Sequence, residues 1–192
     1  NPVDPEAGVR EVPFSRTLYI EADDFLEEPI PKYKRLTPGG QECRLKGAYL
    51  IRCTGCMKNA AGEVIEVLCE YDPASKGGNP ADGRKVKGAT IHWVEAETAA
   101  DAEVRLYDAL FTDPDGPEKN FLDFLNPESL QILTHCKVEQ GLAQAPMPEA
   151  GKTAKAYQFM RQGYFCLDSQ DASPTHLVFN RSVSLKDSFK KK

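Results

Sequence analysis

The sequence contains little that would span a membrane or carry out catalysis. Its 192 residues include no apolar run close to the ~20 residues that a membrane-spanning helix needs. The first residues lack the basic head and apolar body of a secretion signal. Only three histidines occur, far apart, and no nucleophile motif or glycine-rich phosphate loop accompanies them. We therefore expect a cytoplasmic protein with no catalytic residue in this chain.

Metal ligands are also scarce, although six cysteines are present. Cys53 and Cys56 have the two-residue spacing of half a zinc site, but Cys43 and Cys69 stand alone and no histidine lies nearby. We therefore expect reduced thiols that pack as small apolar side chains, and no bound metal. A zinc site is the alternative.

Positive charge is in deficit overall, with 24 Lys plus Arg against 29 Asp plus Glu, a net charge of −5 and a pI near 5.3. Such a balance is unusual for a nucleic-acid-binding domain. The charge is unevenly distributed, however. Residues 76–92 hold four cations and one acid, and residues 151–192 hold eight cations and three acids. Because salt screens exposed charges beyond roughly 8–10 Å, local basic stretches suffice for phosphate binding.

Short strands separated by turn residues dominate the pattern. Seven segments rich in β-branched and aromatic residues predict strands: 16–20, 47–53, 64–71, 89–94, 102–108, 162–168 and 176–183. Asn59 to Gly62 predicts a hairpin turn, and the apolar spacing at 117–130 predicts a short helix ended by Pro127. We expect an all-β fold, mainly antiparallel, built as barrels or sandwiches with one or two short helices.

Two polar clusters are candidate binding sites. The first is a glycine-rich loop with four cations: Lys76, Arg84, Lys85 and Lys87. Such a loop is suited to gripping phosphates and base edges, and a solvated turn is the equally weighted alternative.

The second cluster covers residues 157–165. Strand alternation predicts that Tyr157, Phe159 and Arg161 face one way and Gln158 the other, unless a bulge near Gly163 changes the register. Gln and Arg are good readers of an unpaired base, whereas the aromatic residues are more often part of a core.

Several of these segments closely resemble the C-terminal anticodon-binding region of glutaminyl-tRNA synthetases. The resemblance runs from about Val12 to Asp187 and is most specific in the DGRKVKGATIHWV block (82–94) and in GYFCLDS. The matching segments are PFSRTLYIEADDF (13–25), RLKGAYLIRC (44–53), YDP (71–73), NPADGRKVKGATIHWV (79–94), AEVRLYDALF (102–111), YQFMRQGYFCLDS (157–169) and VFNRSVSLKD (178–187). Archaeal and eukaryotic-type glutamyl-tRNA synthetases share the architecture and are the nearest alternative.

The resemblance implies two β-barrels, one inserted into the other. The expected boundaries are 12–25 plus 110–187 for one barrel, 26–109 for the inserted barrel and 188–192 for a basic tail. The implied partners are the anticodon arm of glutamine tRNA and an N-terminal catalytic domain of the same polypeptide, which uses ATP and Mg to activate glutamine. Neither of that domain's HIGH-like and KMSKS-like motifs occurs here, so no cofactor is expected in this chain. Since the chain begins with Asn1 and not with methionine, we expect a piece of a longer polypeptide, with processing as the alternative. We also expect a monomer.

The resemblance also implies roles for individual residues. Arg16, Gln158 and Arg161 match positions that read the middle anticodon base. The cations Lys76, Arg84, Lys85 and Lys87 lie in the loop that contacts the outer anticodon bases and their phosphates. A non-catalytic protein-interaction module is the alternative function from another class, and an autonomous enzyme would need a nucleophile or metal cluster that the sequence does not show.

Overall fold

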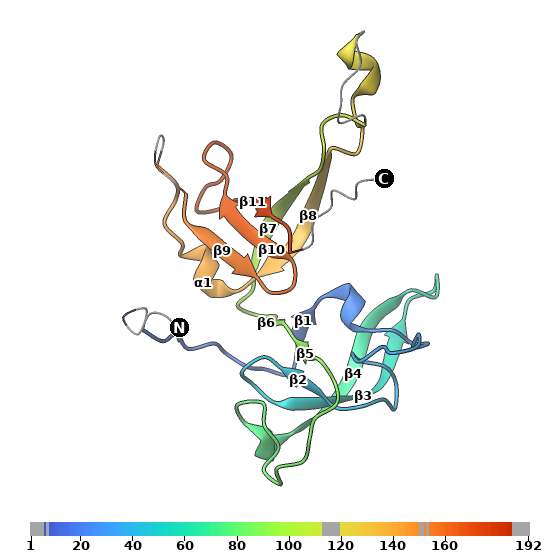
Figure 1. Ribbon diagram of the computed structural model, residues 1–192. Helices are drawn as coiled ribbons and strands as arrows, with labels where there is room; N and C mark the ends of the chain where they lie inside the picture. The colour runs from blue at the N-terminus through green and yellow to red at the C-terminus, as the bar shows by residue number, and fades with distance from the viewer. Residues whose placement is uncertain (1–5, 7, 113–119, 150–151, 153, 186–192) are drawn as a thin grey trace. The chain divides into compact units, whose positions relative to one another are not determined.

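The computed structural model describes residues 6, 8–112, 120–149, 152 and 154–185 (Figure 1). The chain divides into two compact units, residues 1–97 and residues 98–192. Strands make up most of the regular structure in both units. The expectation of a mainly β protein is confirmed. Two parallel pairs, one in each unit, make the sheets mixed.

The first unit contains a four-stranded sheet and a two-stranded one. The larger sheet has the order β4-β3-β2-β5, with β2 and β5 parallel, and the smaller pairs β1 with β6. Two short 3₁₀ helices, η2 (Ala22–Asp24) and η3 (Pro73–Ser75), lie between strands. The strands are β1 (Leu18–Ile20), β2 (Cys43–Leu45), β3 (Leu50–Lys58), β4 (Val64–Asp72), β5 (Thr90–Ile91) and β6 (Trp93–Glu95).

The turn between β3 and β4 is the hairpin that the sequence predicts. Asn59 Oδ1 accepts hydrogen bonds from the backbone N–H groups of Ala61 and Glu63 at 3.0 and 2.9 Å. Gly62 adopts a φ of +82°, a conformation that glycine reaches without a steric penalty. The turn is thus closed by local chemistry alone.

The core of the first unit lies between these sheets and the segments that cover them. Leu45 and Ile91, on the parallel pair, are almost completely buried, at 1% and 0% exposure. The buried cluster consists of Phe25, Leu36, Cys43, Leu45, Ala48, Ile51, Cys53 and Ile91.

The second unit is built on one five-stranded sheet with the order β8-β7-β11-β10-β9. β11 runs parallel to β7, and the other neighbours are antiparallel. A 3₁₀ helix, η4 (Phe121–Phe124), lies between β7 and β8, and the four-residue helix α1 (Gln140–Ala143) follows β8. The strands are β7 (Ala100–Tyr107), β8 (Leu130–Val138), β9 (Ala156–Phe159), β10 (Gly163–Leu167) and β11 (Leu177–Val183).

Aromatic side chains fill the core of the second unit. Phe159 stacks on Phe165 with ring centroids 4.3 Å apart and meets Phe179 edge-on at 5.2 Å. Phe165 and Phe179 are buried, at 2% and 0% exposure. This aromatic cluster is separate from the core of the first unit.

The seven predicted strands are all present. β9 matches the strand alternation predicted from Tyr157 to Phe159, and the missed strands are β2 and β8. β2 has only three residues, and β8 is largely exposed although Leu130, Ile132, Cys136 and Val138 lie at alternate positions. The helix predicted over 117–130 is limited, among the described residues, to η4, and its first residues, 117–119, lie outside them.

The sequence-based domain boundaries do not coincide with the two units. The boundary between the two units falls between residues 97 and 98. The expected division instead combines 12–25 with 110–187 in one barrel and makes 26–109 a second barrel inserted into it. Those boundaries stay a prediction, and the basic tail at 188–192 lies outside the described residues.

Candidate nucleic-acid interface

The four predicted cations of the first cluster lie on the segment between η3 and β5, here named the basic loop (residues 76–88). Its beginning is fixed by Ser75, which is fully buried. The Ser75 hydroxyl donates to the carbonyl of Asp72 at 2.6 Å and accepts from the backbone N–H of Leu50 at 2.8 Å. Asp72 in turn caps η3 by accepting from the N–H of Ala74 at 2.9 Å. The YDP motif therefore anchors the loop to the edge of the sheet.

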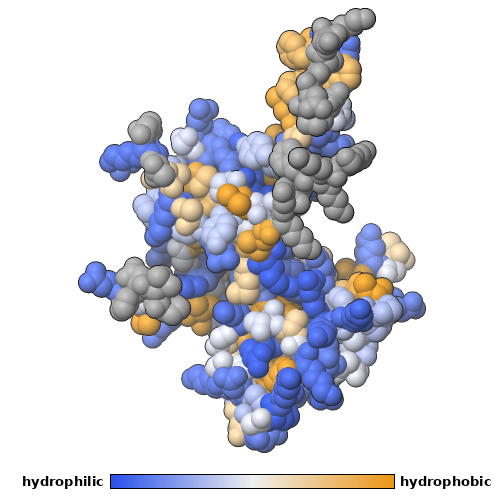
Figure 2. All heavy atoms as spheres, viewed as in Figure 1, coloured by the Kyte–Doolittle hydropathy of each residue, from blue (hydrophilic) through white to orange (hydrophobic). Residues whose placement is uncertain are grey.

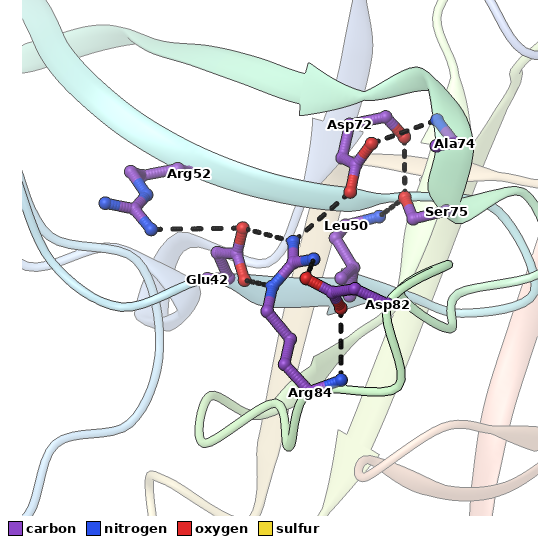
Figure 3. A network of polar contacts seen from close by, with 8 residues as sticks. All are labelled: Glu42, Leu50, Arg52, Asp72, Ala74, Ser75, Asp82 and Arg84. Carbon is purple, nitrogen blue, oxygen red and sulfur yellow. Dashed lines mark hydrogen bonds and ion pairs between the residues drawn. The ribbon is translucent and has the colours of Figure 1, made fainter.

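Arg84 is bound by three carboxylates (Figure 3). Its Nε and Nη2 donate to the two carboxylate oxygens of Glu42 at 3.1 and 2.9 Å. Nη2 also donates to Asp72 at 3.2 Å, and Nη1 donates to Asp82 at 2.9 Å. The hydrogen bond from Arg84 lowers the pKa of Glu42 below its ordinary value. The side chain is thus committed to contacts within the first unit.

Two glycines let the basic loop approach β2 closely. Gly78 has a φ of +85°, and Arg44 Nε donates a hydrogen bond to its carbonyl oxygen. A Cβ on Gly88 would lie 2.1 Å from the carbonyl oxygen of Glu42. Any larger residue at position 88 would therefore push the loop off the strand.

The three lysines of the basic loop are placed differently from Arg84. All four cations, Arg84 included, are exposed, but no hydrogen bond or ion pair joins Lys76, Lys85 or Lys87 to another described residue. Figure 2 shows hydrophilic residues predominating at the bottom of the view, where Figure 1 draws this loop in green. Their ammonium groups are therefore available to an anionic ligand.

The second cluster forms the hairpin of β9 and β10. Tyr157 and Phe159 pack into the core, and Gln158 is exposed, as predicted. The prediction that Arg161 continues this alternation is wrong, because the chain turns there: Arg161 has a φ of +65°, and the N–H of Gln162 donates to the carbonyl of Phe159 at 2.9 Å. Arg161 thus lies at the tip of a tight turn next to Gly163, which has a φ of +139°.

Arg16 is exposed and lies just before β1. The segment that carries it is held by its neighbours. The Ser15 hydroxyl donates to the buried carboxylate of Glu95 at 2.6 Å, and Phe14 packs on Tyr49 with centroids 4.9 Å apart. Arg16 belongs to the first unit, with the basic loop, whereas Gln158 and Arg161 belong to the second. The predicted site residues therefore fall into two sets, one in each unit.

The partners of Arg84 were missed by the sequence analysis. Glu42 lies 42 residues before Arg84 and carries no local signal, whereas Asp72 stands in the YDP motif and Asp82 directly precedes Gly83. Acidic residues so distant in sequence become neighbours only after β2, β4 and the loop have come together.

The cysteine pair has the surroundings of packed thiols. Cys53 is buried opposite Cys69 on the β3–β4 hairpin, and Cys56 is half-buried. Burial raises the pKa of the nearby Cys43 thiol to about 11, so it stays protonated at neutral pH. Within the described ranges, no three His, Cys, Asp or Glu side chains are arranged to hold a metal ion. Nor does that part of the chain include a helix long and apolar enough to cross a membrane.

Comparison with known proteins gives two family matches along the chain. Both families are described as the anticodon-binding domain of class I tRNA synthetases (E and Q), one matching residues 1–72 and the other residues 90–168. The chain belongs to this family of anticodon-binding regions, as the sequence resemblance predicted.

Individual relatives point to the glutamine branch of the family. The chain is 52% identical to the glutamine–tRNA ligase of Clostridium kluyveri over 193 positions, which cover 99% of the chain and 33% of that protein. It is 48% identical to the ligase of Bradyrhizobium diazoefficiens (100% and 33% covered) and 52% identical to that of Pseudomonas putida (96% and 32% covered). It thus spans about a third of the length of these relatives, and it corresponds to the C-terminal anticodon-binding region of glutaminyl-tRNA synthetase.

Proposed function

We propose that this chain binds the anticodon arm of glutamine tRNA. The observation that carries the proposal is the basic loop, which presents Lys76, Lys85 and Lys87 to solvent from an anchored backbone, within a chain that belongs to an anticodon-binding family. Exposed lysines supply point charges for phosphates, and single-stranded loops are the parts of RNA whose bases proteins read most readily.

Base reading is proposed for Arg16, Gln158 and Arg161. All three carry side chains that can hydrogen-bond an unpaired base edge. Arg161 lies in the turn after β9 and is half-buried, with its Nε buried, and Gln158 lies on the exposed face of β9, opposite to the face that packs in the core. In this proposal phosphate contacts position the RNA and these three residues discriminate the middle base.

The remaining two thirds of the polypeptide would carry the chemistry. We propose that a separate catalytic domain joins glutamine to its tRNA with ATP, in the cytoplasm, and that this chain selects the tRNA. The finer fold belongs to the same proposal: two β-barrels, one inserted into the other.

The proposal is tested by titrating the 192-residue chain with stem-loop RNAs at several salt concentrations. We expect tighter binding to the anticodon stem-loop of glutamine tRNA than to one with an unrelated anticodon. The logarithm of the binding constant should fall linearly with the logarithm of salt, by roughly 0.7 for each phosphate contacted. The double substitution Lys85→Ala and Lys87→Ala should reduce that slope by roughly 1–2.

Lys58→Ala is the matched control. Lys58 lies at the far end of β3, on the order of 25 Å along the strand from Leu50, and pairs with Glu27 at 2.5 Å. Its loss should leave the slope nearly unchanged. Equal binding to all stem-loops would refute base reading, preference for a glutamate anticodon would favour the glutamyl branch, and no binding would favour a protein-interaction module.

A further inference from the structure

The basic loop contains four cations, but one of them has a different environment from the other three. All four side chains are exposed, but Arg84 is ion-paired with three carboxylates, whereas the lysines have no partner among the described residues. The two environments imply two different tasks.

The donors of Arg84 are almost fully used inside the protein. A guanidinium has five N–H donors. Four of them are taken by Glu42, Asp72 and Asp82 at 2.9–3.2 Å, including a two-bonded contact with Glu42. One N–H remains, on Nη1. Because strong phosphate recognition by arginine uses two parallel hydrogen bonds, Arg84 cannot offer a phosphate that geometry in this arrangement.

The charge around Arg84 also disfavours an anion. Three carboxylates and two guanidinium groups meet there, since Arg52 Nη2 lies 3.9 Å from Glu42, and the network carries one net negative charge. A phosphate that approached Arg84 would therefore meet repulsion from the carboxylates that already hold it.

The three carboxylates come from different parts of the first unit (Figure 3). Glu42 directly precedes β2, Asp72 ends β4 and Asp82 lies within the basic loop itself. Arg84 consequently ties the distal half of the loop to two strands of the sheet. A planar guanidinium can bridge all three, which a single ammonium group cannot do with the same geometry.

The burial of the residues that follow Arg84 indicates how the attachment of Arg84 to the sheet orients the neighbouring lysines. Val86 is half-buried, while Lys85 and Lys87 on either side of it are exposed. With Arg84 held against the sheet, the two lysines are kept on the outer side of the loop.

We infer that Arg84 is a positioning residue, which orders the basic loop through Glu42, Asp72 and Asp82 so that the neighbouring lysines meet the RNA phosphates. This inference rests on the proposed function. Under this inference Arg84 does not contact a phosphate. Glu42, although negatively charged, supports RNA binding indirectly, because it holds Arg84 in place.

The decisive comparison is between Arg84→Gln and Glu42→Gln in the stem-loop titration. A positioning role predicts that each substitution weakens binding roughly three- to tenfold, because the ordering of the loop must then be restored on binding. The salt slope should keep its native value, and the double variant should bind no more weakly than the weaker single variant, since both changes break one network. Arg84→Lys should not restore binding, because it restores charge without the bridging geometry.

A phosphate contact by Arg84 predicts the opposite pattern and would overturn the inference. In that case Arg84→Gln reduces the salt slope by roughly 1, Arg84→Lys restores most of it, and Glu42→Gln strengthens binding by removing a competing acid. Glu66→Gln is the control for general charge: Glu66 is exposed on β4 opposite Met57, near the far end of the hairpin.

A measurement without RNA separates this inference from the proposed function. Amide hydrogen exchange should speed up in residues 76–88 of both the Arg84→Gln and the Glu42→Gln variants, with the β3–β4 hairpin still protected. Unchanged exchange in the loop would overturn the positioning role whatever the chain binds. Faster exchange in a chain that binds no stem-loop would instead reject the proposed function and keep Arg84 as the organiser of the loop.

Discussion

At the scale of single residues, backbone conformation decides where the arginine of the second cluster can act. Arg161 adopts a left-handed conformation, with a φ of +65°, which is uncommon for a residue with a side chain. Gly163 follows, and a Cβ there would lie 2.3 Å from the carbonyl oxygen of Val183. Such conformations persist where the surrounding structure or a function maintains them.

Arg161→Gly separates the role of the side chain from that of the backbone. Glycine adopts a positive φ without strain, so the turn should keep its conformation, and the urea midpoint of unfolding measures what the loss of the half-buried side chain costs. Discrimination between stem-loops that differ in the middle anticodon base should fall by roughly 10-fold or more, as expected for loss of a base-reading arginine. Lys32→Gly, which also replaces a residue at positive φ, is the control. Retained discrimination would contradict a base-reading role for Arg161.

At the scale of elements, the basic loop and the β3–β4 hairpin show two ways of holding a turn. Asn59 closes the hairpin through hydrogen bonds to residues two and four positions away. The basic loop is instead closed by Arg84 through residues as distant as Glu42. A short turn can therefore be inferred from its own residues, whereas a long loop needs its surroundings.

The Arg84 network predicts an acid-sensitive loop. The contact with Arg84 lowers the pKa of Glu42, and hydrogen bonds from Arg84 also lower that of Asp82. A carboxylate with a depressed folded-state pKa adds stability above its unfolded value, about 4.3 for Glu, and that contribution is lost as the pH falls through the folded value. The first unit should therefore lose stability as the pH drops below about 4.5, and Glu42→Gln should flatten this dependence.

Trp93 gives a specific readout for this pH dependence. It is the only tryptophan of the chain and lies in β6 of the first unit, so its fluorescence follows the urea unfolding of that unit. Asp168, whose pKa is also lowered, lies in the second unit and should not affect this signal directly. An equal pH slope in the native chain and in Glu42→Gln would contradict the prediction.

At the scale of the whole molecule, two units with separate cores follow one another along the chain. Leu45 is 1% exposed within the first cluster, and Phe179 is fully buried within the second. Each family match lies largely within one unit. The two units can therefore be perturbed one at a time.

Core truncations should act on their own unit. Leu45→Ala should lower the stability of the first unit by about 2–5 kcal/mol, and Phe179→Ala that of the second by about 3–5 kcal/mol. Trp93 fluorescence should report the first change and only weakly the second, while hydrogen exchange of residues 98–185 should show the reverse. A single transition that both substitutions shift equally would show that the two units unfold together.

Much of the fold and part of the site follow from local patterns. Strands and the hairpin turn at Asn59 depend on residues close in sequence, which is why they were predicted correctly, and the role of the lysines of the basic loop stays a prediction. β8 was missed although Leu130, Ile132, Cys136 and Val138 lie at alternate positions; most of its residues are exposed, and its pairing with β7 defines it as a strand. The helix at 117–130 was over-predicted, since apolar spacing alone does not distinguish an α-helix from a short 3₁₀ turn.

The sequence by itself determined the β-rich class, the family and the two basic stretches within an acidic chain. Only the tertiary structure decided which cations are available: it surrounds Arg84 with carboxylates, exposes Lys85 and Lys87, and places Arg161 in a turn. The reason is physical. Strand and turn preferences depend on near neighbours, whereas the charge that a side chain presents to a ligand depends on every group that folding brings within a few ångströms of it.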